Sequence, residues 1–341
     1  MRARYSLWLL ALVTFVAGCG APPLRPPATA PLPTAALSIT PLPTEPPQAA
    51  QPTAAPVTEA PATAVAAQTE APPTETPASE PWRFVVLGDT RTSGLYPPEV
   101  MAQIVARAAE ARPDAVLIVG DLINAMDDQA SVREQWRNWR EVAAPLGARF
   151  MLPTPGNHDV QGHAWATELM VEAFPELPRN GPPGYEGLTY ALDYGGVRFI
   201  SLHSEVFGAP HRLGEAQLVW LEAQLRDNPN PHTIVFSHDP AFPVGPHVGG
   251  SLDVYPAERD RLWALLREHR VTAYIAGHEH LYSRQEIEGV TQIIAGTSGS
   301  WPYGGFGGDF WHYVVAEVRP EGIEMVVYDV DGVERDRFTL S

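Results

Sequence analysis

Prolines divide this chain into a part that cannot build a hydrophobic core and a part that can. The sequence has 341 residues and 36 prolines, of which 17 lie between residues 22 and 81. Residues 19–81 are mainly Pro, Ala and Thr, with no periodic apolar pattern. Such a segment buries too little apolar surface to offset its chain entropy, so we expect a disordered linker there. The foldable domain is therefore predicted to span residues 82–341.

The first 18 residues are predicted to be a signal peptide. Two arginines precede an apolar run over residues 5–16, which is typical of secretory signals and shorter than the roughly 20 residues that cross a bilayer. Residues 16–19, Val-Ala-Gly-Cys, resemble the lipobox of bacterial lipoproteins. The resemblance implies cleavage before Cys19, lipid attachment to its sulfur, and anchoring at the extracytoplasmic face of the bacterial cell membrane. An uncleaved anchor and an ordinary signal peptide with a chance cysteine are the alternatives.

Net charge and cysteine content limit which binding partners and covalent cross-links are expected. The formal net charge of −17 argues against broad nucleic-acid binding, because that binding relies on Lys and Arg to neutralise phosphates. Cys19 is the sole cysteine, so an intrachain disulfide is excluded. The sequence does not predict an oligomeric state.

After Trp82, short apolar runs alternate with helical patterns. Buried strands are predicted over residues 84–87, 115–119, 233–236 and 272–276, and a hairpin over 189–201. Helices are predicted over residues 99–110, around Leu218, Leu221 and Leu225, and from Ser131, where Ser-Val-Arg-Glu has the pattern of a capping box. This alternation indicates an α/β core with mainly parallel central strands, and the hairpins indicate two packed sheets with helices outside.

Five apolar runs end in polar clusters of the same character. The clusters are Gly88-Asp89, Gly120-Asp121, Gly156-Asn157-His158-Asp159, Ser237-His238-Asp239 and Gly277-His278-Glu279-His280. Ligands of open α/β sheets bind beyond the carboxyl ends of the strands, so we expect these side chains to converge. Asp and Asn offer hard oxygen ligands, His offers nitrogen, and sulfur is lacking. The set therefore predicts a catalytic site for Mn, Fe, Co or Zn.

The order of the clusters resembles that of the calcineurin-like metallophosphoesterases, which include purple acid phosphatases and class III cyclic-nucleotide phosphodiesterases. The resemblance covers nearly all of residues 82–341. Residues 215–221, Glu-Ala-Gln-Leu-Val-Trp-Leu, look like a family helix, and residues 278–284 resemble the purple-phosphatase form of the last motif. The resemblance implies an αββα four-layer sandwich, two mixed sheets flanked by helices, and a metal-dependent phosphoric ester hydrolase.

The resemblance also implies a pair of divalent metal ions and roles for individual residues. Asp121 would bridge the two ions. The other implied ligands are Asn157, His238 and His278 for one ion, and Asp89 and His280 for the other. His158 would contact the substrate or protonate the leaving group, with Asp159 orienting its ring.

One position departs from the family pattern. Most phosphodiesterase-like members have Asp-x-His in the first motif, whereas this chain has Asp89-Thr90-Arg91. Purple acid phosphatases compensate with a Tyr three residues after the second Asp, where this chain has Asn124. Arginine cannot ligate a metal at ordinary pH. Arg91 is predicted either to clamp phosphate or to supply the charge of a weakly held or absent first ion. The third alternative is a surface arginine that points away.

The leading functional hypothesis is hydrolysis of a phosphomonoester or phosphodiester outside the cytoplasm. A metal-activated hydroxide would attack the phosphorus. The alternative is a lipid-anchored pseudoenzyme that binds a phosphorylated envelope ligand, which the missing first-motif His keeps open. The substrate itself is not written in the sequence. Residues 301–306, rich in aromatics and glycine, either line a substrate pocket or pack beneath a loop.

Overall fold

The computed structural model describes residues 80–341. The predicted signal peptide, Cys19 and nearly all of the predicted linker lie outside the described residues. Within the described part of the chain, no helix is both long enough and apolar enough to cross a membrane.

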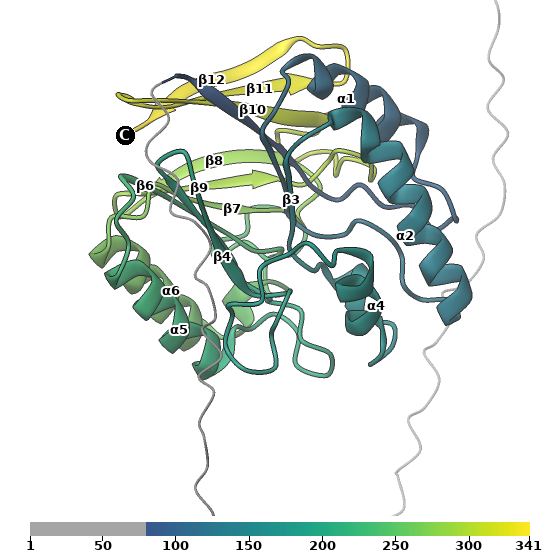
Figure 1. The fold of residues 1–341 in the computed structure, drawn as a ribbon, viewed down its shortest axis with the longest axis horizontal. Coiled ribbons are helices and arrows are strands. Elements are labelled where there is room, and N and C mark those ends of the chain that lie inside the picture. Colours follow the sequence, from purple (N-terminus) through teal and green to yellow (C-terminus); the bar gives the residue numbers. More distant parts are fainter. Residues whose placement is uncertain (1–79) are drawn as a thin grey trace, which may run out of the picture. The chain divides into compact units, whose positions relative to one another are not determined.

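Two six-stranded sheets lie against each other, and helices cover their outer faces (Figure 1). The first sheet has the order β12-β11-β10-β1-β2-β3, with strands β1 (Trp82–Leu87), β2 (Ala115–Ile118), β3 (Phe150–Pro153), β10 (His312–Arg319), β11 (Gly322–Asp329) and β12 (Glu334–Leu340). The second has the order β4-β5-β6-β7-β9-β8, with strands β4 (Tyr190–Tyr194), β5 (Val197–Ser201), β6 (His232–Phe236), β7 (Ala273–Ala276), β8 (Tyr282–Ile287) and β9 (Val290–Ala295).

Both sheets are mixed. Strands β1, β2 and β3 are parallel, and so are β5, β6, β7 and β9. The added strands β10, β11, β12, β4 and β8 pair antiparallel. The predicted αββα sandwich with central parallel strands is therefore confirmed. The parallel strands of each sheet deliver their carboxyl ends to one edge.

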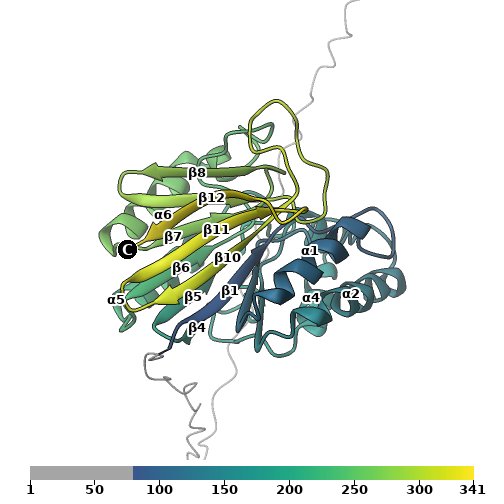
Figure 2. The same ribbon diagram turned by 90° about the horizontal axis from the view of Figure 1, so that it is seen from above.

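Helices flank the two sheets on opposite sides (Figure 2). One side carries α1 (Glu99–Glu110), α2 (Gln129–Ala143) and α4 (Ala166–Ala173), and the other carries α5 (Gly214–Arg226) and α6 (Pro256–Glu268). Three short helical turns lie in the connections: η1 (Ala144–Leu146), α3 (Asn157–Val160) and η2 (Leu252–Val254).

The predicted N-cap of α2 is wrong by three residues. Asp128 is the N-cap, and its Oδ1 accepts hydrogen bonds from the backbone amides of Ala130 and Ser131 at 2.9 and 3.2 Å. The Ser131 hydroxyl donates to Asp128 Oδ2 at 3.0 Å. An aspartate carboxylate thus satisfies the amides of the first turn, so the serine lies inside the helix instead of opening it.

Alternating side chains of the central strands build two apolar layers. On β6, Ile234 and Phe236 belong to the core between the sheets, whereas Val235 packs with the helices α5 and α6. Across the inner layer, Phe84 of β1 meets Phe199 of β5 edge to face, with ring centroids 5.4 Å apart. Burial on both faces explains why these strands are continuous apolar runs, and it fixes where their polar ends lie.

Candidate metal centre

Five strand ends meet at this site, three from one sheet and two from the other. The predicted metal ligands follow β1, β2, β3, β6 and β7 directly: Asp89, Asp121, Asn157, His238, His278 and His280. Three of them, Asp89, Asp121 and His278, adopt left-handed backbone with φ of 51°, 55° and 68°. Such conformations cost about 1–3 kcal/mol each in a residue other than glycine, so the surrounding structure holds them in place.

Two glycines permit the close approach of the strand ends. A Cβ atom at Gly156 would overlap the backbone and side chain of Asp121, and one at Gly277 would overlap the carboxylate of Asp89. The absence of a side chain at these two positions lets adjacent motifs pack directly against the carboxylates.

The first group of donor atoms surrounds His238. Its Nε2 lies 3.1 Å from Asn157 Oδ1, 3.1 Å from His278 Nδ1 and 3.5 Å from Asp121 Oδ1. The outward nitrogens face backbone carbonyls: His238 Nδ1 lies 2.9 Å from the oxygen of Val119, and His278 Nε2 lies 2.9 Å from that of Gly250. A carbonyl only accepts, so both outward nitrogens carry the proton, and both inward nitrogens present lone pairs.

The second group follows the same rule. His280 Nδ1 lies 3.1 Å from the carbonyl oxygen of Trp301, so its Nε2, 3.3 Å from Asp89 Oδ1, also presents a lone pair. Asp89 Oδ2 accepts a hydrogen bond from the amide of His278 at 3.0 Å. Asp89 Oδ1 is buried and has no hydrogen-bond partner among residues 80–341. Donor atoms of Asp89, Asp121 and His280 all lie within 4.8 Å of one another.

These contacts set electron pairs against electron pairs, which is favourable only with positive charge between them. Oxygen and imidazole ligands in two adjoining groups that share Asp121 suit a pair of divalent cations. The acidity of the site agrees. Burial alone would lower the pKa of His238, but Asp121, Asp89 and Asp239 raise it to about 9, so the carboxylates around this imidazole favour positive charge there.

Arg91 points into the site, which excludes the alternative of a surface arginine that points away. Its Nε donates to Asp121 Oδ2 at 2.9 Å. Burial alone would raise the pKa of Asp121, but the charges of His238, His158 and Arg91 outweigh burial and hold it well below its usual range. The implied bridging carboxylate is thus ionised and is bound by an arginine.

His158 lies beside Asp121, but the role predicted for Asp159 is wrong. Both oxygens of Asp159 accept backbone hydrogen bonds, Oδ1 from the amides of Leu122 and Ile123 and Oδ2 from that of Gly156, each at 2.9 Å. Adjacent residues of a helical turn point in different directions, so Asp159 ties down the loop after β2. Asn124 takes the orienting position instead, with Oδ1 2.9 Å from His158 Nδ1.

Tyr303 and His247, to which the sequence assigned no definite role, pack on the rings of two proposed ligands. Tyr303 stacks on His280, with centroids 4.4 Å apart and an interplanar angle of 8°, and His247 lies over His278 at 4.0 Å. The ring of Tyr303 therefore packs against a ligand, whereas Trp301 and Phe306 are exposed. Their spacing in the sequence carries no signal for these contacts, because both come from irregular loops.

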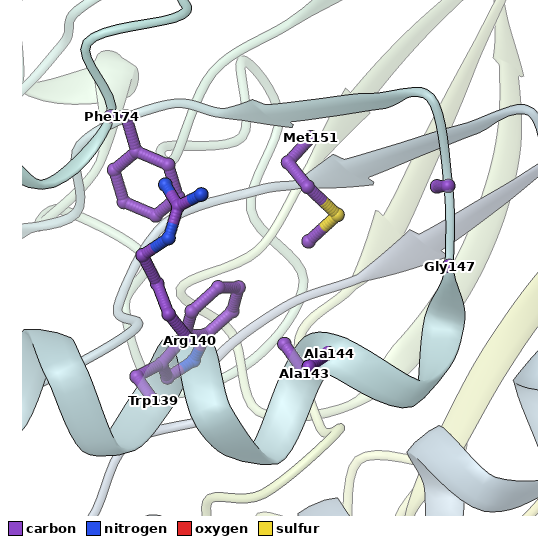
Figure 3. Close-up of a pocket in the computed structure, with 8 residues that line it drawn as sticks. Trp139, Arg140, Ala143, Ala144, Gly147, Met151 and Phe174 are labelled. Atoms are coloured by element: carbon purple, nitrogen blue, oxygen red, sulfur yellow. The ribbon is translucent and has the colours of Figure 1, made fainter.

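A separate hollow lies away from these ligands (Figure 3). It is lined by residues of α2, the turn after α2 and β3, including Trp139, Arg140 and Met151, and by Phe174, which follows α4. Arg140 lies over the Phe174 ring at 5.1 Å and donates to Glu176. The hollow is therefore a gap in the packing of the outer helix layer, and it contains none of the predicted site residues.

The segment that carries the proposed metal ligands also matches a known protein family. A family model described as calcineurin-like phosphoesterase matches residues 83–282. Two solved structures are similar in fold, each with a TM-score of 0.58. A purple acid phosphatase from yellow lupin is 19% identical, over 79% of this chain and 55% of that one. A dimetal phosphatase from Danio rerio is 14% identical, over 76% and 98%.

Three curated relatives are similar in sequence. A glycerophosphodiester phosphodiesterase, GpdQ, of Enterobacter lignolyticus is 31% identical over 172 residues, 50% of this chain and 56% of that protein. A probable cyclic nucleotide phosphodiesterase of Rhodococcus erythropolis is 28% identical over 59% and 62%. The 3',5'-cyclic adenosine monophosphate phosphodiesterase CpdA of Escherichia coli is 45% identical over 39% and 42%. The chain therefore spans less than two thirds of the length of each of these relatives.

The opposed lone pairs predict that divalent cations stabilise the fold. With Mn²⁺ or Zn²⁺ at about 100 times the dissociation constant, we expect a gain of about 2.7 kcal/mol, which is on the order of 5–10 °C in melting temperature. The gain should be largely lost in His238→Gln and retained in His269→Gln, a histidine at the end of α6. Thermal melts with and without chelator measure it. Equal shifts in all three proteins would contradict the assignment.

Proposed function

The chain belongs to the calcineurin-like phosphoesterase family, and from this premise we propose that residues 82–341 hydrolyse a phosphoric ester, with diesters as the favoured class. The observation that carries the proposal is the shared carboxylate. Asp121 joins both groups of metal donors, and its Oδ1 also accepts the backbone amide of His158 at 2.9 Å. The names of the three curated relatives, all phosphodiesterases, support diesters over monoesters.

The six ligands are proposed to hold two divalent cations, Mn, Fe, Zn or Co. Cations there supply Lewis acidity to the phosphate and to the attacking water. The chain's own residues hold the ligand atoms in position and keep water away from the carboxylates. Asp89 and Asp121 are buried, so their charge acts at low dielectric, and the three backbone carbonyls hold each imidazole in one tautomer.

His158 is proposed to carry a proton to the leaving oxygen. Because the Asn124 amide oxygen accepts from Nδ1, that nitrogen carries its proton permanently, and Nε2 is the ring atom that exchanges one with the substrate. The hydrogen bond also fixes the direction of the ring. Asn124 is therefore a positioning residue, and His158 is the catalytic residue of this step.

Arg91 is proposed to hold one phosphate oxygen pair. An arginine bound through Nε still has two terminal amino groups to offer a phosphate. The pairing of Nε with Asp121 holds the guanidinium beside the residues that would bind the cations. The same contact favours the second candidate function, a non-catalytic phosphate-binding protein, because Arg91 occupies the bridging carboxylate. Cation binding without turnover of an aryl phosphate ester would support that second function.

We also propose that the domain works outside the cytoplasm, anchored to the membrane through lipid on Cys19. The apolar run over residues 5–16 and the position of the sole cysteine support this. The segment over residues 19–81 would then hold the domain away from the membrane surface.

His158→Gln should slow esters with poor leaving groups more than activated ones. For an alkyl phosphodiester we expect kcat to fall by about 10²–10⁴, because the leaving alkoxide needs a proton. For bis(p-nitrophenyl) phosphate the loss should be far smaller, because nitrophenolate leaves unprotonated. Steady-state kinetics on both esters measures the difference. His163→Gln, which removes a ring stacked on Trp165, is the matched control. Equal losses for the two esters would count against proton transfer by His158.

Arg91→Ala should raise KM by about 10- to 100-fold, as expected for the loss of a charged hydrogen-bonding group, and leave bound metal unchanged. Arg91→His restores the Asp-x-His pattern of the first motif. This variant distinguishes an arginine that binds phosphate from one that supplies the charge of a missing cation. If the arginine stands in for a cation, Arg91→His will tighten the binding of one cation in calorimetric titration. No change in KM or in cation affinity in either variant would contradict both roles.

Cells fed labelled palmitate should incorporate the label into the wild-type protein and not into Cys19→Ala. The share of the variant in the membrane fraction should also fall, because the lipid would be missing. Gel autoradiography after membrane fractionation measures both. Label that persists in Cys19→Ala would rule out this anchor.

A further inference from the structure

A second cluster of carboxylates and imidazole adjoins the metal centre and is not used by the proposed mechanism. It consists of Glu205, which follows β5, His211, in the loop before α5, and Asp239, the residue after His238. We call it the Glu205 cluster. Glu205 and Asp239 are fully buried, and His211 is half-buried. Three separate stretches of chain thus bring two negative groups into an interior that normally excludes them.

The three side chains converge on a common point. His211 Nδ1 lies 3.0 Å from Glu205 Oε1 and 3.4 Å from Asp239 Oδ2. Asp239 Oδ1 is buried and has no hydrogen-bond partner within the described part of the chain, and Glu205 Oε1 has only its charge contact with His211 Nδ1. A buried carboxylate oxygen left in this way is costly, so the cluster lacks something that would satisfy it.

We propose that Glu205, His211 and Asp239 bind a further divalent transition-metal cation, distinct from those held at Asp121. One imidazole nitrogen and two carboxylates form a ligand set that suits Zn, Mn, Fe or Co. Ligands bound at about 2.0–2.2 Å lie roughly 3–3.6 Å from one another, and the two separations from His211 Nδ1 fall within that range. The half-buried imidazole marks the side from which an ion enters.

The neighbouring His278 is not a ligand of the proposed cation in the Glu205 cluster. His278 Nε2 lies 3.6 Å from Asp239 Oδ1, but that nitrogen carries a proton toward the carbonyl of Gly250 and cannot also ligate. His278 therefore serves the centre at Asp121, and Asp239 connects the two sites. The Glu205 cluster is thus adjacent to the first centre but has its own donors.

Charge supports a cation in the Glu205 cluster. Glu205 and Asp239 are both buried and both lie against His211 Nδ1, so their negative charges repel and favour a positive partner between them. The competing partner is a protonated His211, which would form ion pairs with Glu205 and Asp239 at 3.0 and 3.4 Å. An ion pair with His211 alone and a bound cation differ in one countable quantity, the number of metal equivalents.

The test is metal stoichiometry of the full-length protein, loaded with Mn²⁺ or Zn²⁺ alone and measured by mass spectrometry after exhaustive dialysis. We expect His211→Gln and Glu205→Gln each to bind one equivalent less than wild type, and His269→Gln to match wild type. His211→Gln alters a half-buried loop side chain, so it keeps the test valid if Glu205→Gln folds poorly. Circular dichroism melts verify folding.

An Asp121→Asn background separates this proposal from the proposed hydrolytic centre. With the shared carboxylate weakened, one equivalent should remain, and it should disappear when His211→Gln is added. If His211→Gln and Glu205→Gln match wild type in both backgrounds, the Glu205 cluster is an ion pair with protonated His211 and the proposal is overturned. Loss of metal in Asp121→Asn alone would leave no equivalent for the Glu205 cluster and would overturn it equally.

Discussion

Three backbone carbonyls determine what this site can do. The oxygens of Val119, Gly250 and Trp301 each accept from the outward nitrogen of one histidine. Each imidazole is thereby fixed in the tautomer whose inward nitrogen is a bare lone pair. Because the facing groups are carboxylate and amide oxygens, the centre is an unfavourable arrangement until positive charge enters it. The backbone, and not only the side chains, therefore makes this a cation site.

The two sheets share this arrangement. Asp89, Asp121 and Asn157 follow strands of one sheet, whereas His238 and His278 follow strands of the other. The inner apolar layer, with Phe84 against Phe199, sets the separation of the sheets and so the distance between the two halves of the ligand set. The geometry of the site therefore depends on the packing of the core. A shift of one sheet over the other would separate the carboxylates from the imidazoles.

The sequence predicted those parts that depend on buried parallel strands. Strands apolar on both faces are continuous runs, and their carboxyl ends share an edge, so Asp89 and Asp121 could be placed together before any coordinates. The direction of each side chain within a turn could not be predicted from the sequence. His158 and Asp159 are neighbours in sequence, yet Asp159 bonds backbone amides and Asn124 holds the His158 ring. The partners His247, Glu205 and His211 come from irregular loops, where no periodicity indicates what a side chain will meet. The start of α2 failed for a related reason, because Asp128 and Ser131 are both good caps and only geometry selects between them.

Trp301 joins the interior of the site to its surface. Its carbonyl oxygen accepts a hydrogen bond from His280. The residue is 76% exposed, and its indole ring packs against Trp311 with ring centroids 4.9 Å apart. A molecule that settles on this indole is one peptide unit away from an imidazole of the centre. A change in the backbone at this one residue would therefore reach both an imidazole of the centre and an aromatic ring at the protein surface.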